Sequence, residues 1–334
     1  MKVKLKRVGD QVMVITGASS GIGLSTAKAA ARRGAKVVLV SRDEADLTRA
    51  AEEIRATGGT ALVHVADVAD AAAMRYLAER VVTELGGIDS WVNNAGVSIY
   101  GRVEEVSLDD ARRLFETNYW GVVNGSLAAI PHLRSSGGAL INVGSIASDT
   151  AIPLQGHYSA SKHAVKGFTD ALRLELEREG APIAVTLVRP ASIDTPYPHH
   201  AKNYLEMEPK QLAPVYAPEV VADVILACAE RPRRAVYAGG AAKVISSMES
   251  WAPRAVERYK EARFFDRQRS DEPSRHHDIL YGPRAGDGRE RGDYPGRTRR
   301  SSALTSASLH RGRTALGIAA LGAGLAYAAS RRER

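Results

Sequence analysis

A tyrosine and a lysine four residues apart, Tyr158 and Lys162, are the residues of this sequence best suited to acid–base chemistry. Side chains at i and i+4 share one face of a helix, which would bring the lysine ammonium close to the phenol. A phenol with its ordinary pKa of about 10 transfers protons poorly near neutrality, but an adjacent positive charge favours the phenolate and lowers that pKa. The spacing therefore predicts that Tyr158 exchanges a proton with a substrate and that Lys162 lowers the pKa of Tyr158. The alternative is an unreactive pair on a helix surface.

A serine hydroxyl, that of Ser145, is expected beside this pair. Ser145 lies 13 residues before Tyr158 and directly follows residues 139–144, an apolar run that is typical of a buried strand. The carboxyl ends of parallel strands are where α/β proteins bind their ligands. Ser145 could therefore donate a hydrogen bond to a substrate oxygen and hold that oxygen in place.

A glycine-rich segment, residues 16–23 (Thr-Gly-Ala-Ser-Ser-Gly-Ile-Gly), connects the first apolar run to the first segment of helical composition. Gly17 can form the tight turn, Gly21 lets the backbone approach a pyrophosphate, and Gly23 allows the helix to pack closely on the strand. The phosphate charge would then face the helix N-terminus. The alternative is an ordinary strand-to-helix turn, and the spacing G-x-x-x-G-x-G differs from the commoner G-x-G-x-x-G.

The elements that position these residues follow from an alternation of short apolar runs and longer Ala/Leu/Glu/Arg-rich segments. The runs are rich in Val and Ile, as is typical of strands buried on both faces. Strands that alternate with helices indicate a parallel sheet with right-handed crossovers. We therefore predict an α/β fold, a doubly wound parallel sheet (Rossmann fold), in a single catalytic domain over residues 1–240. The predicted strands are residues 11–16, 36–41, 60–65, 88–93, 139–144, 183–189 and 235–238.

Taken together, these motifs resemble the short-chain dehydrogenase/reductase family, in its shorter single-domain branch, over about residues 10–240. The Tyr-x-x-x-Lys spacing is found in that family, and residues 93–96 (Asn-Asn-Ala-Gly) match a second family motif after the fourth strand. The resemblance implies that Asn118 holds a water linking Lys162 to solvent, which completes a tetrad of Asn118, Ser145, Tyr158 and Lys162. It also implies a nicotinamide cofactor that supplies or accepts a hydride. The cofactor-binding residues that it implies are Gly17, Ser19, Ser20, Gly21, Ile22, Gly23, Ser41, Arg42, Asp67, Val68, Asn94, Ala95, Gly96, Tyr158, Lys162, Pro190, Ile193 and Thr195.

The choice of cofactor depends on Ser41 and Arg42, just after the second predicted strand. An acidic residue there would bind the adenine ribose hydroxyls of NAD and repel a 2′-phosphate. A small polar residue followed by an arginine suits the phosphate of NADP instead. We therefore predict NADP, with NAD less favoured; the alternative is that Arg42 only stacks on the adenine. Asp67 resembles the family's adenine-contacting aspartate, or it caps a helix that begins near Asp70.

A further segment, residues 189–196 (Arg-Pro-Ala-Ser-Ile-Asp-Thr-Pro), resembles the family segment that closes over the nicotinamide, with Thr195 reaching the carboxamide or the phosphates. Alanine stands at position 191, where the family usually has glycine. Residues 197–216 would then form a substrate lid, and its two adjacent histidines lack companion ligands, so we predict no metal site. The expected pocket walls, each of which could equally pack in the core, are Tyr100, Trp120, Leu154, His157 and Tyr197.

The composition excludes several classes of protein. Of the 334 residues 44% are hydrophobic and 25% are charged, which is ordinary for a globular chain. Cys228 is the one cysteine, which excludes a disulfide-stapled secreted scaffold and favours a cytoplasmic location. The net charge is +8, but residues 266–334 carry +6 of it, with 14 Arg against 8 Asp plus Glu. A nearly neutral body without a recognisable nucleic-acid module argues against nucleic-acid binding.

The chain after residue 240 loses the strand–helix alternation. Residues 241–265 are expected to form a helical extension, with Trp251 and Phe264 as packing residues. Residues 266–313 contain only four large aliphatic residues and 11 Arg, which predicts a disordered linker. Residues 314–330 are uncharged and flanked by arginines, which predicts a membrane-spanning helix or, alternatively, an Ala-rich helix that docks on the body or on a partner subunit.

The function predicted from these features is that of an NADP-dependent oxidoreductase that interconverts an apolar ketone and a secondary alcohol, with Tyr158 as the acid–base. The alternative from another class is a non-catalytic NADP-binding redox sensor, against which the complete tetrad argues. Epimerases and dehydratases share Tyr-x-x-x-Lys, but they normally carry a different glycine spacing and a larger substrate domain. The resemblance also implies a homo-oligomer, which we expect in the cytoplasm and, if residues 314–330 insert, at the cytoplasmic face of a membrane.

Overall fold

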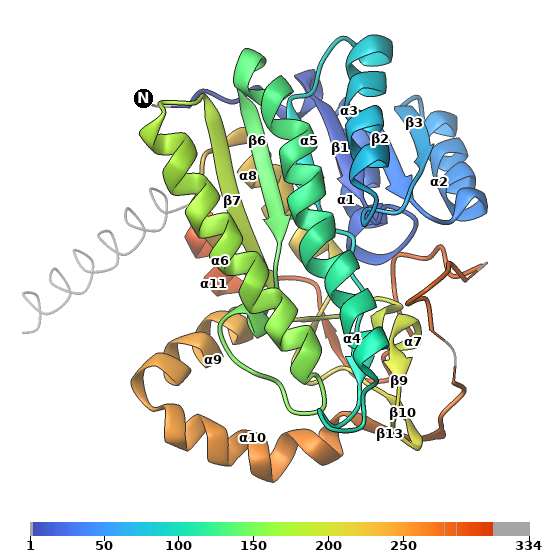
Figure 1. Cartoon of the computed structure of the whole chain (residues 1–334), viewed down its shortest axis with the longest axis vertical. Helices are drawn as coiled ribbons and strands as arrows, with labels where there is room; N and C mark the ends of the chain where they lie inside the picture. Colours follow the sequence, from blue (N-terminus) through green and yellow to red (C-terminus); the bar gives the residue numbers. More distant parts are fainter. Residues whose placement is uncertain (1–2, 277, 285, 310–334) are drawn as a thin grey trace, which may run out of the picture.

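A seven-stranded parallel sheet forms the centre of the computed structural model, which describes residues 3–276, 278–284 and 286–309 (Figure 1). Its strand order is β3-β2-β1-β4-β6-β7-β12. Each of the seven strands matches a predicted apolar run to within two residues, so the doubly wound parallel fold is confirmed. The strands are β1 (Val12–Thr16), β2 (Lys36–Ser41), β3 (Thr60–Val65), β4 (Ser90–Asn93), β6 (Gly138–Val143), β7 (Ile183–Pro190) and β12 (Ala235–Ala238).

Helices cover both faces of the sheet because successive strand residues point to opposite sides and both sides are apolar. Met13 and Ile15 of β1 pack with α1, α2 and α8, whereas Val12 and Val14 pack with α3, α5 and α6, the layer in front in Figure 1. These six helices are α1 (Gly21–Arg32), α2 (Glu44–Ala56), α3 (Ala71–Leu85), α5 (Gly121–Ser136), α6 (Gly156–Arg178) and α8 (Pro218–Glu230).

Polar residues at the helix starts fix where several helices begin. Asp43 caps α2 by accepting a hydrogen bond from the Asp46 N–H, and Asp70 caps α3 by accepting from Ala72 and Ala73. Such caps satisfy backbone donors that the first turn leaves without partners. Asp67 is therefore free for another role, since Asp70 is the cap of α3.

The strand order reverses between β1 and β4, and the connections at this edge build the smaller elements around the resulting crevice. These elements form three small sheets, β5 with β9, β10 with β13 (Arg269–Pro273), and β8 with β11 and β14 (Thr298–Arg299). The remaining elements before residue 240 are η1 (Val8–Asp10), β5 (Ile99–Tyr100), α4 (Leu108–Phe115), the π-helical segment η2 (Glu116–Trp120), η3 (Ile146–Ser148), β8 (Ser192–Ile193), α7 (Tyr197–His200), β9 (Lys202–Asn203), β10 (Met207–Pro209) and β11 (Val215–Tyr216).

The C-terminal extension differs from the predicted linker. After α9 (Gly240–Trp251) and α10 (Pro253–Arg267), the chain forms β13 (Arg269–Pro273), β14 (Thr298–Arg299) and α11 (Ala303–Leu309) on the body of the protein. The expectation of disorder over residues 266–313 is therefore wrong for the described part of that range. The prediction from composition failed because this segment contacts the body mainly through ion pairs and backbone carbonyls rather than through buried apolar side chains.

Two further features of the extension bear on the predictions. Phe264 is buried as expected, whereas Trp251 is 91% exposed and does not pack on the body. Within the described residues, no helix has the length and apolar character needed to cross a membrane. The candidate segment 314–330 lies outside them.

Candidate active site

The glycine loop between β1 and α1 has the tight geometry that the sequence predicts. Gly17 has φ +65°, and a Cβ there would lie 2.8 Å from the Ala95 Cα. A Cβ at Gly23 would lie 2.1 Å from the Gly17 carbonyl oxygen, so only glycine lets α1 approach the loop so closely. Asn94, at the end of β4, ties the two motifs together because its Nδ2 donates to the Thr16 carbonyl at 3.0 Å.

The predicted catalytic residues converge at the carboxyl edge of the sheet. Ser145 follows β6 and caps η3, and its Oγ accepts from the Ala147 N–H at 3.1 Å. Tyr158 and Lys162 stand one turn apart on α6, and all three side chains are buried. The Lys162 Nζ donates to the Val143 carbonyl at 3.1 Å and lies 5.7 Å from the centre of the Tyr158 ring.

Asn118 completes this group from a π-helical segment rather than from a regular α-helix. Its side-chain amide bonds the Val97 backbone on both sides, with Oδ1 accepting at 2.8 Å and Nδ2 donating at 2.9 Å. A Cβ at Gly96 would lie 3.3 Å from Asn118 Oδ1 and 3.6 Å from Lys162 Nζ, so both groups face the same point. Single π turns inside helices are often found at functional sites.

The electrostatics of the pair differ from the expectation. Burial raises the pKa of the Tyr158 hydroxyl, and hydrogen bonds with Ser145 and Tyr197 act in the opposite direction. Burial also lowers the pKa of Lys162 to about 8. The pKa of Tyr158 is therefore raised rather than lowered as the spacing predicts, because loss of solvation outweighs the hydrogen bonds with Ser145 and Tyr197.

A second phenol and two glutamines extend the site toward the C-terminal extension. The Tyr197 ring meets the Tyr158 ring edge-on, with 5.7 Å between ring centres, and its hydroxyl donates to Gln155 Oε1 at 3.2 Å. Gln155 in turn donates to Oε1 of Gln268, which is fully buried at the end of α10. Of the expected pocket walls, Tyr100 and Tyr197 line the cavity beside Tyr158, together with Ile152 and Leu212. Trp120, Leu154 and His157 are not among its lining residues.

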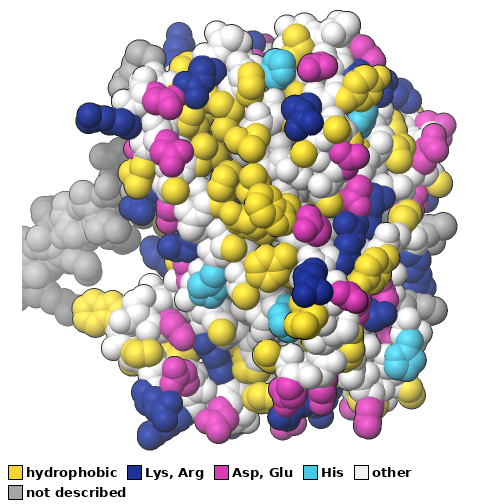
Figure 2. Space-filling view, viewed as in Figure 1, with side chains coloured by type: hydrophobic (Ala, Val, Ile, Leu, Met, Phe, Trp, Pro, Cys, Tyr) yellow, Lys and Arg dark blue, Asp and Glu magenta, His cyan; other side chains and the backbone are white. Residues whose placement is uncertain are grey.

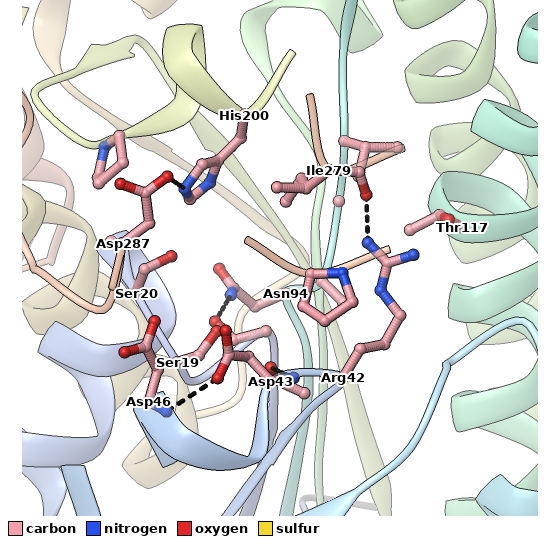
Figure 3. Close-up of a pocket in the computed structure, with 18 of the residues that line it drawn as sticks. Ser19, Ser20, Arg42, Asp43, Asp46, Asn94, Thr117, His200, Ile279 and Asp287 are labelled. Carbon is pink, nitrogen blue, oxygen red and sulfur yellow. Dashed lines mark hydrogen bonds and ion pairs between the residues drawn. The ribbon is translucent and has the colours of Figure 1, made fainter. Parts of the chain in front are cut away.

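Arg42 lies where the sequence predicts a phosphate-binding cation, but it has partners of its own. Its guanidinium donates to the carbonyl of Ile279 (Figure 3) and to that of Leu280, and it lies 3.9 Å from the Asp67 carboxylate. Burial alone would raise the pKa of Asp67, but a hydrogen bond from the Ala69 N–H and the charge of Arg113 lower it below its ordinary value. The Asp67 carboxylate is therefore ionised and faces the cavity as an acceptor.

Two adjoining cavities contain nearly all of the predicted residues. The larger runs along the glycine loop to Arg42 and Asp67, and the smaller holds Ser145, Tyr158 and Lys162. Gly23 and Asn118 line neither cavity and lie behind the residues that do. Residues shared by both cavities are Ile22, Asn94, Gly96, Thr195 and Tyr197.

Several lining residues of the larger cavity escaped the sequence analysis. Two groups of them come from the start of α2 and from the C-terminal segment, and no sequence motif marks the C-terminal group. Figure 3 shows the two groups facing one another across the cavity. The missed residues are Asp43, Asp46, Ala66, Val97, Thr117, Ile279, Pro283, Arg284 and Asp287, and His200 enters the cavity from the segment predicted as a lid.

The loop after β7 accommodates the alanine that replaces the usual glycine. Among the described non-glycine residues only Leu154 and His276 have positive φ, so Ala191 takes a conformation open to any residue. The rings of His199 and His200 lie 3.5 and 3.2 Å from the carboxylates of Asp293 and Asp287, and the part of the chain that the structure describes holds no group of three or more potential metal ligands.

This cleft fits a dinucleotide by its own geometry. Thr195 lies against Gly21 at the start of α1, and the small side chains of Ser19 and Ser20 line the cavity at the same place. A helix N-terminus attracts phosphate, and Arg42 supplies a cation at the far end of the cavity.

Known proteins with this arrangement agree on the family. The family model described as short chain dehydrogenase matches residues 11–204. The uncharacterized oxidoreductase YxnA of Bacillus subtilis is 42% identical over 339 residues, which cover 100% of this chain and 94% of that protein.

Two solved structures share the fold. A short-chain dehydrogenase/reductase from Burkholderia phymatum in complex with NAD gives a TM-score of 0.67 at 25% identity, covering 82% of this chain and 99% of the other. An alcohol dehydrogenase from the archaeon Thermococcus sibiricus, complexed with 5-hydroxy-NADP, gives 0.60 at 26% identity, covering 68% and 95%. The matched family model, the full-length relative and the catalytic geometry lead to one conclusion: the chain is an oxidoreductase of the short-chain dehydrogenase/reductase family.

Proposed function

We propose that this protein is an NADP-dependent enzyme that interconverts an apolar ketone and the corresponding secondary alcohol. The observation that carries the proposal is the convergence of Ser145, Tyr158 and Lys162 in a buried cavity that opens onto the glycine-loop cleft. A bound nicotinamide would supply or accept the hydride. The chain's own task is then to hold the substrate oxygen and to move one proton.

The proton step falls to Tyr158. In the direction of reduction, the Ser145 and Tyr158 hydroxyls would donate hydrogen bonds to the carbonyl oxygen, and Tyr158 would transfer its proton as the alkoxide forms. Lys162, with its pKa of about 8, is mostly protonated at pH 7 and would stabilise the tyrosinate that this transfer leaves behind. Asn118 holds the Val97 backbone next to Lys162 and would position the water that returns the proton.

The substrate class follows from the walls of the smaller cavity. Ile152, Ile193 and Leu212 supply apolar surface, while polar groups gather near Tyr158. Such a cavity favours a molecule with one reactive oxygen and an apolar remainder.

The cofactor preference rests on Arg42 and Ser41. The Arg42 side chain is only 19% exposed, so a phosphate bound there would be largely desolvated and strongly attracted. The Asp67 and Asp43 carboxylates line the same cavity and oppose this attraction. The protein relatives of known structure include both an NAD complex and a 5-hydroxy-NADP complex, so the preference has to be measured in this chain.

An assembly of identical subunits is the other part of the proposal. Figure 2 shows hydrophobic side chains gathered on the face formed by α5 and α6. On this face Leu127, Leu174 and Trp120 are 59%, 62% and 46% exposed. Apolar side chains that collect on one face of a soluble domain mark an interface, and two-fold pairing buries the same patch twice.

The proposal is tested with the purified full chain and a panel of apolar ketones and secondary alcohols, by following the absorbance of NADPH. The expected result is turnover of at least one ketone that requires NADPH and that Tyr158→Phe abolishes. If no member of a broad panel turns over although the protein binds NADPH, the enzymatic proposal is wrong and the protein is a cofactor sensor.

A further inference from the structure

The cofactor cleft has an outer wall made by a segment far away in sequence. Residues 278–284 and 286–293, here called the strap, come after β13 in the chain and line the mouth of the larger cavity up to the start of α1. In Figure 3, Ile279 and Asp287 of the strap lie across the cavity from Ser19 and Asp46. Ile279, Pro283, Arg284 and Asp287 line the cavity from this side.

The first end of the strap is buried against α4. Leu280 is fully buried, and its carbonyl accepts from Arg113 Nε at 3.0 Å. The Tyr281 hydroxyl donates to Asp110 Oδ1 at 2.7 Å. Apolar burial and hydrogen bonds to charged partners together make this end a firm anchor.

The other end of the strap is held by polar contacts near the surface. The Arg289 carbonyl accepts from the Gly21 N–H at 2.9 Å, and the Gly288 carbonyl accepts from Arg49 at 2.8 Å. Glu290 pairs with Lys28 at 3.1 Å. Partly exposed ion pairs contribute little to stability, so this end can detach at modest cost.

The strap carbonyls occupy groups that the cofactor needs. The Gly21 N–H lies at the N-terminus of α1, where a pyrophosphate is expected, and it donates to Arg289. Arg42, expected to bind the 2′-phosphate, donates two of its five N–H groups to the carbonyls of Ile279 and Leu280 at the anchored end, and its other N–H groups can bind the phosphate while that end stays in place. A backbone carbonyl is the neutral equivalent of a phosphate oxygen, and the strap places carbonyls at both ends of the nucleotide site.

We propose that the strap is the gate of the cofactor site: residues 286–293 leave the start of α1 to let a dinucleotide enter or depart, while the Leu280 end stays in place. Gly282 and Gly286 provide the hinge, because neither has another atom within 4 Å of its Cβ position and Gly286 has φ +84°. The inference rests on the proposed function for the identity of the nucleotide only.

A disulfide across the closed gate tests this directly. A Cβ built at Gly288 lies 2.5 Å from the Asp46 Cγ, and Gly288 does not need positive φ, so cysteines at these two positions are within reach of one another. The Arg49 side chain would have to move, which its 46% exposure allows. The native Cys228 is fully buried and does not compete.

The experiment compares the Asp46→Cys/Gly288→Cys protein with itself, oxidised and reduced, so the effects of the substitutions cancel. We expect NADPH to associate at least tenfold more slowly with the oxidised protein, by stopped-flow fluorescence, and a reductant to restore the rate. Gly288→Cys alone, treated in the same way, is the control and should not respond. Equal association rates in the oxidised and reduced double variant would overturn the gate. If the reduced protein binds neither NADPH nor NADH, the proposed function fails instead.

A second variant keeps the inference testable if the cysteine pair impairs folding. Asp287 pairs with His200 at 3.2 Å across the cavity mouth, and both side chains are largely shielded from solvent. Asp287→Asn should weaken the closed gate and raise both the association and the release rate of NADPH by about 3- to 10-fold. Unchanged rates in this variant would contradict the gate.

Discussion

Replacing Arg42 by alanine tests the cofactor preference, and the structure sets the size of the effect. The side chain is 19% exposed, so its contact with a 2′-phosphate would be charge-assisted and largely desolvated. Such contacts are worth about 1.5–3 kcal/mol, or roughly 10- to 150-fold in kcat/KM. Asp67, 3.9 Å from the guanidinium, already neutralises part of its charge, so we expect the lower half of the range, about 10- to 40-fold.

The assay is kcat/KM for NADPH and for NADH in both proteins, because NADH lacks only the phosphate and serves as the internal reference. Wild type should favour NADPH, and Arg42→Ala should lose most of that preference while its use of NADH changes little. Arg80→Ala is the matched control, since Arg80 pairs with Glu84 on α3 and lines neither cavity. A wild type that favours NADH, or a ratio that Arg42→Ala leaves unchanged, would refute the reasoning.

Three other predictions concern stability, assembly and location. Burial lowers the pKa of Lys162 from 10.5 to about 8, so the charged lysine destabilises the folded protein below pH 8, and this destabilisation fades as the pH rises to 10.5. In denaturant titrations Lys162→Met should therefore be more stable than wild type at pH 7, by at most about 3 kcal/mol, and should lose that advantage by pH 10. Leu127→Glu should dissociate the assembly, and sedimentation of an unchanged oligomer would exclude α5 from the interface. Cell fractionation should find the full chain with membranes and a version ending at Arg313 in the soluble fraction; two soluble proteins would exclude an anchor.

The sheet was predictable because its strands are buried on both faces. Runs such as residues 36–41 contain little but β-branched and aliphatic residues, which is typical of such strands. The convergence of Ser145, Tyr158 and Lys162 was predictable because they lie at a strand end or on one helix face, and the parallel topology brings strand ends together, whereas Asn118 came from the family resemblance alone.

The strap was not predictable by the same reasoning. Its contacts use backbone carbonyls of Ile279, Leu280 and Arg289, which have no signature in the sequence, and ion pairs such as Lys28–Glu290, whose partners lie far apart in the chain. A prediction of order from composition depends on how much apolar surface a segment can bury, and Leu280 is almost the only buried apolar side chain of the strap. The raised pKa of Tyr158 was not predicted for a related reason. The i,i+4 spacing places Lys162 near Tyr158, but it does not show how deeply the phenol is buried.

The central claim, that Tyr158 is the acid–base of a ketone reductase, is tested most directly by the kcat of Tyr158→Phe. The phenylalanine ring still packs against Tyr197, so NADPH should bind with near-wild-type Kd while kcat falls by about 100-fold or more, because the transferable proton is gone. A kcat within tenfold of wild type would remove Tyr158 from the acid–base role. A parallel loss of NADPH binding would contradict the account as well, because it would show that the hydroxyl supports the structure of the site and not its chemistry.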